Sequence, residues 1–166
     1  MGLFDFFKKK SNKPDFEKLF LEKESEKAIM EIDEWLNEIT QYGQNLSKLN
    51  LSQQIVIIIE NLEREINNGG FNQFYLNSSG NYANETVDYL KKIGANKTAE
   101  IVKRANAEWP NNQVPKDRTE RQIVLERIEE KADPIWENCD QDFYKYPDHI
   151  TDLLLDFVKK NKTDFE

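Results

Sequence analysis

The segment from Glu60 to Gly70, ENLEREINNGG, constrains this chain more than any other, because a very apolar helix ends there on two consecutive glycines. An aromatic run, FNQFY at positions 71–75, follows at once. Glycine at a helix end adopts the left-handed conformation at little cost. The pattern predicts a buried helix that stops at Gly69 and Gly70, followed by a short aromatic turn or helix over residues 71–76. No catalytic geometry requires such a pattern.

The rest of the chain is read as helical because apolar residues recur at three- and four-residue intervals in every long segment. We expect helices over about 25–42, 52–68, 82–93, 96–109, 119–143 and 147–158. No segment alternates apolar and polar residues for long enough to predict a strand. The fold class is therefore all-α, a single compact multi-helix domain of about seven or eight helices. Residues 1–15, which include MGLFDFFKKK, are predicted to be a flexible segment before a domain at 16–166.

Several residues mark the expected helix ends. Asp15 is placed to cap a short turn, Ser52 to cap the central helix, and Thr119 with Gln122 to form a capping box. Gly43 fits the end of the first long helix. Asp133-Pro134 predicts a break or a kink near position 134, and the polar tail from residue 159 is expected to fray.

The charge distribution favours a basic partner. The formal net charge is −8, and residues 126–166 alone contribute 12 acids against 6 bases. A negative surface repels phosphate, so direct binding to nucleic acid is disfavoured, whereas basic proteins are attracted. The single cysteine, Cys139, excludes an internal disulfide and indicates a reducing compartment, hence a cytoplasmic protein. No apolar run approaches membrane-spanning length.

The sequence offers little material for catalysis. One histidine and one cysteine exclude a Cys/His zinc site, and no metal-binding motif is present. We therefore expect no metal site, no catalytic residues and no enzymatic activity. The alternative that stays open is an enzyme with a carboxylate site near Glu60 and Glu63, with Glu65 close by. Burial of one of these groups beside the aromatic residues would raise its pKa.

Five carboxylates follow one another at four- and three-residue spacing and would form one acidic stripe on a continuous helix: Glu126, Glu130, Asp133, Glu137 and Asp140. The stripe would span roughly 21 Å at about 1.5 Å per residue, or one carboxylate per about 5 Å. Phosphates along a strand of B-DNA follow one another every ~3.4 Å. The two spacings are comparable but not matched. Asp142, Asp148, Asp152 and Asp156 would extend the acidic region if the last helix packs alongside.

The aromatic motif and its surroundings carry a family resemblance. The residues concerned are Glu63-x-Glu65-x-Asn67-Asn68-Gly69-Gly70-Phe71-x-Gln73-Phe74, then Asn77-Ser78-Ser79-Gly80, then Leu90-x-x-Ile93-Gly94-Ala95. This pattern resembles a family of small acidic bacterial proteins whose namesake is a DNA mimic of about nineteen kilodaltons. The resemblance is clearest from about Ser52 to Trp109 and does not cover the first 25 residues.

The resemblance implies an all-α, dimeric protein without a cofactor. For the namesake it implies surface carboxylates that imitate DNA phosphates and occupy the DNA-binding face of a regulator. The motif residues themselves are interpreted as structural, serving the turn, the packing and buried hydrogen bonds: Glu63, Asn68, Gly69, Gly70, Phe71, Gln73 and Phe74. Imitation of DNA would then depend on carboxylates outside the motif.

The leading hypothesis is a non-enzymatic acidic protein that binds a basic protein, such as a DNA-binding regulator, through the carboxylates of residues 126–156. A second hypothesis is an immunity-type or adaptor protein whose partner contacts the aromatic motif or an apolar patch. The two differ in salt dependence, since contacts between opposite charges weaken with ionic strength and apolar contacts do not.

Overall fold

The computed structural model describes residues 13–42 and 45–166. Over these residues the chain forms seven α-helices and no β-strand, which confirms the all-α prediction. The helices are α1 (Phe16–Leu19), α2 (Ser25–Thr40), α3 (Leu51–Leu76), α4 (Ala83–Ile93), α5 (Asn96–Asn106), α6 (Arg118–Phe143) and α7 (Ile150–Lys160). The predictions for MGLFDFFKKK and for Gly43 concern residues outside the described ones.

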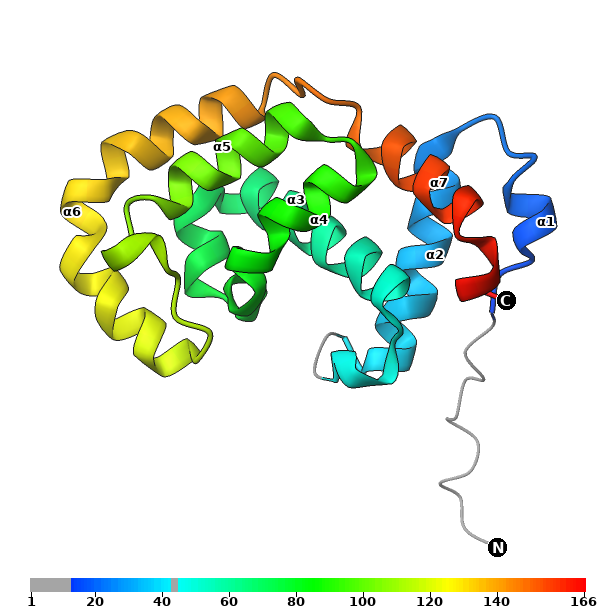
Figure 1. Cartoon of the computed structure of the whole chain (residues 1–166), viewed down its shortest axis with the longest axis horizontal. Helices are drawn as coiled ribbons and strands as arrows, with labels where there is room; N and C mark the ends of the chain where they lie inside the picture. Colours follow the sequence, from blue (N-terminus) through cyan, green and yellow to red (C-terminus); the bar gives the residue numbers. More distant parts are fainter. Residues whose placement is uncertain (1–12, 43–44) are drawn as a thin grey trace, which may run out of the picture.

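Helix α3 is the central element of the fold. It packs against α2, α4 and α6, while α5 packs against α4 and α6. Every residue from Ile55 to Ile59 is buried, as its nearly all-round apolar start predicts. Helix α6 curves along one outer edge, and α7 packs against α2 and α4 toward the other end of the molecule (Figure 1). The polar faces of α6 and α7 therefore lie in different regions of the molecule.

The predicted N-caps of α3 and α6 are both wrong. Helix α3 is capped by Asn50 and not by Ser52: Asn50 Oδ1 accepts from the Gln53 backbone N–H at 3.0 Å, and Gln53 Oε1 accepts from the Asn50 N–H at 3.2 Å. Helix α6 is capped by Asp117 and not by Thr119, since Asp117 Oδ1 accepts from the backbone N–H three residues on at 2.8 Å. In both helices the cap that forms lies two residues earlier in the chain.

Pro134 does not interrupt α6, which is continuous from Arg118 to Phe143 and curves (Figure 1). Proline lacks an N–H, so one carbonyl a turn earlier loses its helical donor. One turn later, Asn138 Nδ2 donates to the Pro134 carbonyl at 2.7 Å. The continuity places residues 126–143 on one helix.

The C-terminal tail is packed, which contradicts the expected fraying. Phe165 is 1% exposed, and its ring lies 5.9 Å from that of Phe16 in α1. The Ser52 hydroxyl donates to Asp164 Oδ2 at 2.5 Å, and Asn50 Nδ2 donates to the Asp164 carbonyl at 2.6 Å. The tail is ordered because a single buried aromatic residue and the start of α3 hold it.

Candidate partner-binding surface

The double glycine divides α3 into two helical segments. Gly69 has a φ of −165° and Gly70 a φ of 72°, so only Gly70 is in the left-handed region. The second segment begins at Phe71, whose backbone N–H donates to Asp140 Oδ1 at 2.8 Å. Asp140, on α6, thereby does for this segment what an N-cap residue does for a helix.

Asp140 is 9% exposed, so its predicted place on an exposed acidic stripe is wrong. Burial raises the pKa of Asp140 to about 6, although the hydrogen bond from Phe71 lowers it; the Glu137 carboxylate raises it. A Cβ atom at Gly70 would lie 2.2 Å from Asp140 Oδ2. Gly70 is therefore required both for its left-handed backbone and for the close approach of this carboxylate.

The aromatic residues of the motif form the inner face of the second segment. Phe71 and Phe74 are both 0% exposed. The Tyr75 ring lies 5.1 Å from that of Trp109 and 5.0 Å from that of Trp136, and its hydroxyl donates to Asn106 at 2.8 Å. A partner cannot contact these rings, so the adaptor hypothesis loses the aromatic motif as its surface.

Polar side chains at and around the motif form hydrogen bonds between the two segments of α3. Gln73 Nε2 donates to Glu65 Oε2 at 2.8 Å. Glu65 also accepts hydrogen bonds from the side chains of Asn77 and Ser79. Glu65 is thus occupied in joining the two segments of α3, whereas Asn68 lies exposed beside the glycines.

Arg121 is a structural residue that sequence reasoning missed. It is 0% exposed and has its pKa lowered by burial. Its guanidinium donates five hydrogen bonds of 2.6–3.0 Å, to the backbone carbonyls of Tyr75, Asn77, Pro115 and Lys116 and to the side-chain oxygen of Asn81. A Cβ at Gly80 would lie 2.8 Å from Arg121 Nε, so this glycine makes room for the guanidinium.

Two carboxylates of α3 lie half-buried on the side that faces α2. Burial raises the pKa of Glu60 to about 8, and the negative charges of Asp33 and Glu63 raise it further, while Arg64 lowers it. Arg64 itself pairs with Asp33, with Nη2 and Oδ2 2.5 Å apart. Burial also raises the pKa of Glu63, against a hydrogen bond from Tyr146.

Replacement of Glu60 by glutamine should stabilise the protein in alkaline solution. The folded pKa lies above the ordinary 4.5, so the carboxyl contributes stability below pH 4.5, and this contribution is lost as the pH rises through about 8. The variant should therefore gain about 2 kcal/mol over wild type at pH 8.5 and nothing near pH 4. Urea unfolding at both pH values measures this. Glu34→Gln, at an exposed position of α2, is the control and should change little at either pH.

Four residues of the predicted stripe lie together on the exposed face of α6. Glu126, Glu130, Asp133 and Glu137 are exposed, and within the described part of the chain no ion pair engages them. Asp133 Oδ1 accepts a long hydrogen bond of 3.4 Å from an asparagine amide, and Glu137 accepts from a glutamine at 3.0 Å. Without Asp140 the stripe spans about 16 Å at the helical rise.

Basic residues of α6 lie to one side of this stripe. Arg127 and Lys131 each follow a stripe residue by one position, and successive helix residues are rotated by about 100°. Both are exposed, and neither makes an ion pair with α6 carboxylates among the residues described. The stripe therefore keeps its negative charge along one line of the helix.

The expected extension of the acidic region does not form. Asp142 pairs with Arg104 at 2.6 Å and with Lys145 at 2.8 Å. Asp148 accepts from the backbone N–H and hydroxyl of Thr98 at 2.8 and 3.0 Å. Asp152 and Asp156 lie on α7, which packs against α2 and α4. The predicted acidic region is thus reduced to Glu126, Glu130, Asp133 and Glu137, which we call the α6 stripe.

Comparison with known proteins identifies the family. The DMP19-like protein family matches residues 47–161, which is more than half of the chain. The chain belongs to this family. The match begins just before α3 and ends just after α7, so it contains the glycine turn, Arg121 and the α6 stripe, and it leaves out α1 and α2. No curated protein and no solved structure matches the chain.

The described residues were also compared with the requirements of a metal site and of a membrane-spanning helix. No three histidine, cysteine or carboxylate side chains within them lie close enough to hold a metal ion. None of the helices described has the length and apolarity needed to cross a bilayer. Cys139 is buried, and Arg104 Nε donates to its sulfur at 3.2 Å.

Proposed function

We propose that this protein binds the DNA-contacting surface of a basic protein through the α6 stripe and acts without enzymatic activity. The observation that carries the proposal is the line of four exposed carboxylates, Glu126, Glu130, Asp133 and Glu137, free of lysine and arginine partners in the described structure. A cationic protein surface would replace solvent around these groups at little cost, since no internal ion pair has to be broken.

The family supports the same proposal. The resemblance of the glycine and aromatic motif to the DNA-mimic family implies that carboxylates outside the motif contact the partner. The aromatic residues of the motif, Phe71 and Phe74, are buried inside the protein. Helix α6, which carries the stripe, curves along an outer edge (Figure 1). The dimer that the resemblance implies, and the bacterial regulator as partner, belong to this proposal.

The test is a competition experiment. The protein is immobilised, partners are captured from a bacterial lysate, and duplex DNA is added as competitor. Bound partners should be released by DNA and by a few tenths molar salt, because both compete for the same cationic surface. Neutralising the α6 stripe (Glu126→Gln, Glu130→Gln, Asp133→Asn and Glu137→Gln) should abolish most of the capture.

A matched variant controls for net charge. The control variant removes an equal number of negative charges from exposed positions of α2, α4 and α7. Its substitutions are Glu31→Gln, Glu34→Gln, Asp88→Asn and Asp156→Asn. This variant should retain capture and its sensitivity to DNA. Equal losses in the two variants would show that overall charge alone governs binding, and capture indifferent to DNA would reject the proposed function.

A further inference from the structure

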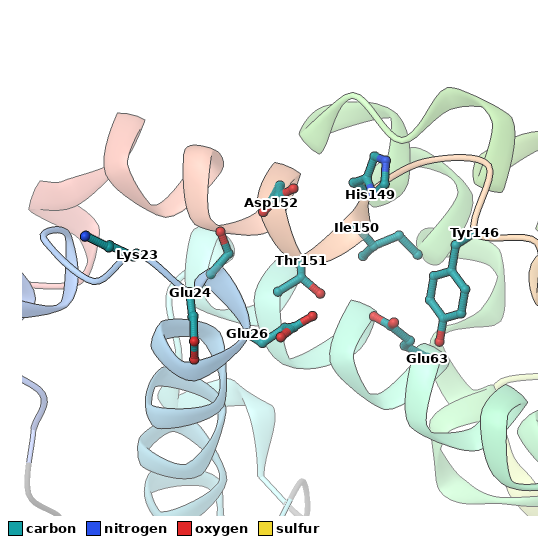
Figure 2. A pocket seen from close by; sticks show the side chains of 10 residues that line it. Lys23, Glu24, Glu26, Glu63, Tyr146, His149, Ile150, Thr151 and Asp152 are labelled. Atoms are coloured by element: carbon teal, nitrogen blue, oxygen red, sulfur yellow. The ribbon is translucent and has the colours of Figure 1, made fainter.

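A cleft lies where α2, α3 and α7 approach one another, and none of the residues that line it belongs to α6. Its volume is about 580 Å³, and it is lined by the start of α2, the middle of α3 and the loop that leads into α7. Figure 2 shows the side chains of Glu26, Thr151 and Glu63 directed into the same space, with Tyr146 beside Glu63. His149 and Asp152 lie along the upper border in this view.

Most of the charged side chains that line the cleft are acidic. It holds four carboxylates, from Glu24, Glu26, Glu63 and Asp152, against one lysine, Lys23. Glu26 and Asp152 stand in the first turns of α2 and α7, where the helix dipole favours negative charge. Their presence is explained by the helices that carry them. Glu63 lies in the middle of α3, and no helix terminus explains it.

Glu63 is a half-buried carboxylate without a cation. Its neighbour Arg64 is bound to Asp33 and to Asn61, and no ion pair within the described ranges engages Glu63. Its partner is the Tyr146 hydroxyl. Asn67 Nδ2 donates to that hydroxyl at 2.8 Å, so the hydroxyl proton is left for the carboxylate. Burial raises the pKa of Glu63, which is the response expected of a carboxylate that lacks a counter-charge.

We propose that this cleft receives the guanidinium or ammonium group of an arginine or lysine side chain from the basic partner. The carboxylate of Glu63 would pair with the cation, and the Tyr146 ring would lie alongside its stem. Glu24, Glu26 and Asp152 at the border would attract the basic segment and repel anions. The inference rests on the proposed function for the identity of the partner and adds a second contact surface to it.

A defined peptide tests the cleft without the natural partner. An octapeptide of alternating arginine and glycine, blocked at both ends, is titrated into the whole protein by calorimetry at low salt. The same peptide with citrulline in place of arginine keeps the shape and loses the charge. The arginine peptide should bind, and the citrulline peptide should not. Amide signals of residues 63, 146 and 151 in NMR spectra should shift on binding.

Glu63→Gln should weaken binding of the arginine peptide by about fivefold or more, since it removes the one partly desolvated charge in the cleft. Glu34→Gln, which removes one charge from the exposed face of α2, should change the affinity less than about twofold. Glu26→Gln provides a second cleft variant and should also weaken binding. Equal affinity of the wild type, Glu63→Gln and Glu26→Gln would overturn the cleft assignment.

Failure of this inference can be told apart from failure of the proposed function. Neutralising the α6 stripe should leave the NMR shifts at residues 63, 146 and 151 in place, because the stripe lies on a different helix. The DNA competition experiment measures binding through the α6 stripe, and the peptide titration of Glu63→Gln measures binding in the cleft. Unchanged peptide binding in Glu63→Gln would reject the cleft as a binding site and leave the proposed function intact. Capture that is insensitive to DNA would reject the proposed function and leave the cleft intact.

Discussion

Arg121→Lys should lower the free energy of unfolding by about 3–4 kcal/mol. The guanidinium of Arg121 donates to five oxygens, and those belong to two segments that it joins, residues 75–81 and 115–116. A lysine ammonium keeps the charge, but its three donors on one nitrogen cannot reach all five oxygens. Each buried oxygen left without a donor costs roughly 1–3 kcal/mol. Urea unfolding of the purified variant measures the loss.

Arg127→Lys is the matched control for this experiment. Arg127 lies on the same helix, is exposed, and makes no ion pair among the described residues. Its replacement should change stability by less than about 0.5 kcal/mol. If Arg121→Lys were as stable as Arg127→Lys, the guanidinium would not hold the loop and turn together as the structure indicates.

Gly70→Ala should cost about 3 kcal/mol, for two separable reasons. Gly70 has a φ of 72° and a ψ of −172°, a backbone region that is essentially restricted to glycine, and a side chain there carries a penalty of roughly 1–3 kcal/mol. The added Cβ would also displace the Asp140 carboxylate, from which it would be 2.2 Å away, so that the Phe71 N–H loses its acceptor. Thermal and urea unfolding give the cost.

Gly94→Ala separates the two reasons. Gly94 has a φ of 91°, and the nearest atom to an added Cβ, Leu153 Cδ2, is 3.8 Å away. Only the backbone penalty of about 1 kcal/mol is expected there. In an Asp140→Ala background, Gly70→Ala should cost only its backbone penalty of roughly 1–3 kcal/mol, which is less than in the wild-type background, since the clash is gone. Equal costs for the two glycines in the wild-type background would contradict the role assigned to Asp140.

The helices could be predicted from the sequence because local signals decide them. The apolar spacing of residues 55–66 and the glycines that follow are sufficient to place α3 and its break. The caps were less accurate, since several residues near each start can accept the same N–H group, and tertiary contacts decide among them. Ser52 shows this, because its hydroxyl is bound to Asp164, which lies 112 residues away in the chain.

The roles of Asp140 and Arg121 could not be predicted, because both depend on the distance between α6 and α3. In a helical pattern Asp140 continues an acidic stripe, and nothing local shows that the Phe71 N–H approaches it. Arg121 gave one signal that could have been used. It lies four residues before Leu125 on the apolar face of α6, where a charged side chain is expected to be buried and hydrogen-bonded.

The extent of the acidic surface could not be predicted from the local sequence either. Counting charges over 126–166 predicts one broad negative area, whereas the fold pairs Asp142 with two cations and places α7 against α2 and α4. The stripe that is left was found by spacing alone, and Glu137 stays on the same helix as the other three residues because α6 continues through Pro134. Short-range periodicity could reveal the stripe, but only tertiary packing fixes its extent.

In the proposed function, the α6 stripe occupies a surface of the partner that otherwise binds DNA. The affinity of a captured partner as a function of salt concentration tests this most directly. With the purified partner, the logarithm of the association constant should fall linearly with the logarithm of salt concentration. Duplex DNA should compete, and neutralising the α6 stripe should flatten the slope while the control variant keeps it. An affinity that ignores salt, duplex DNA and the stripe alike would contradict the claim.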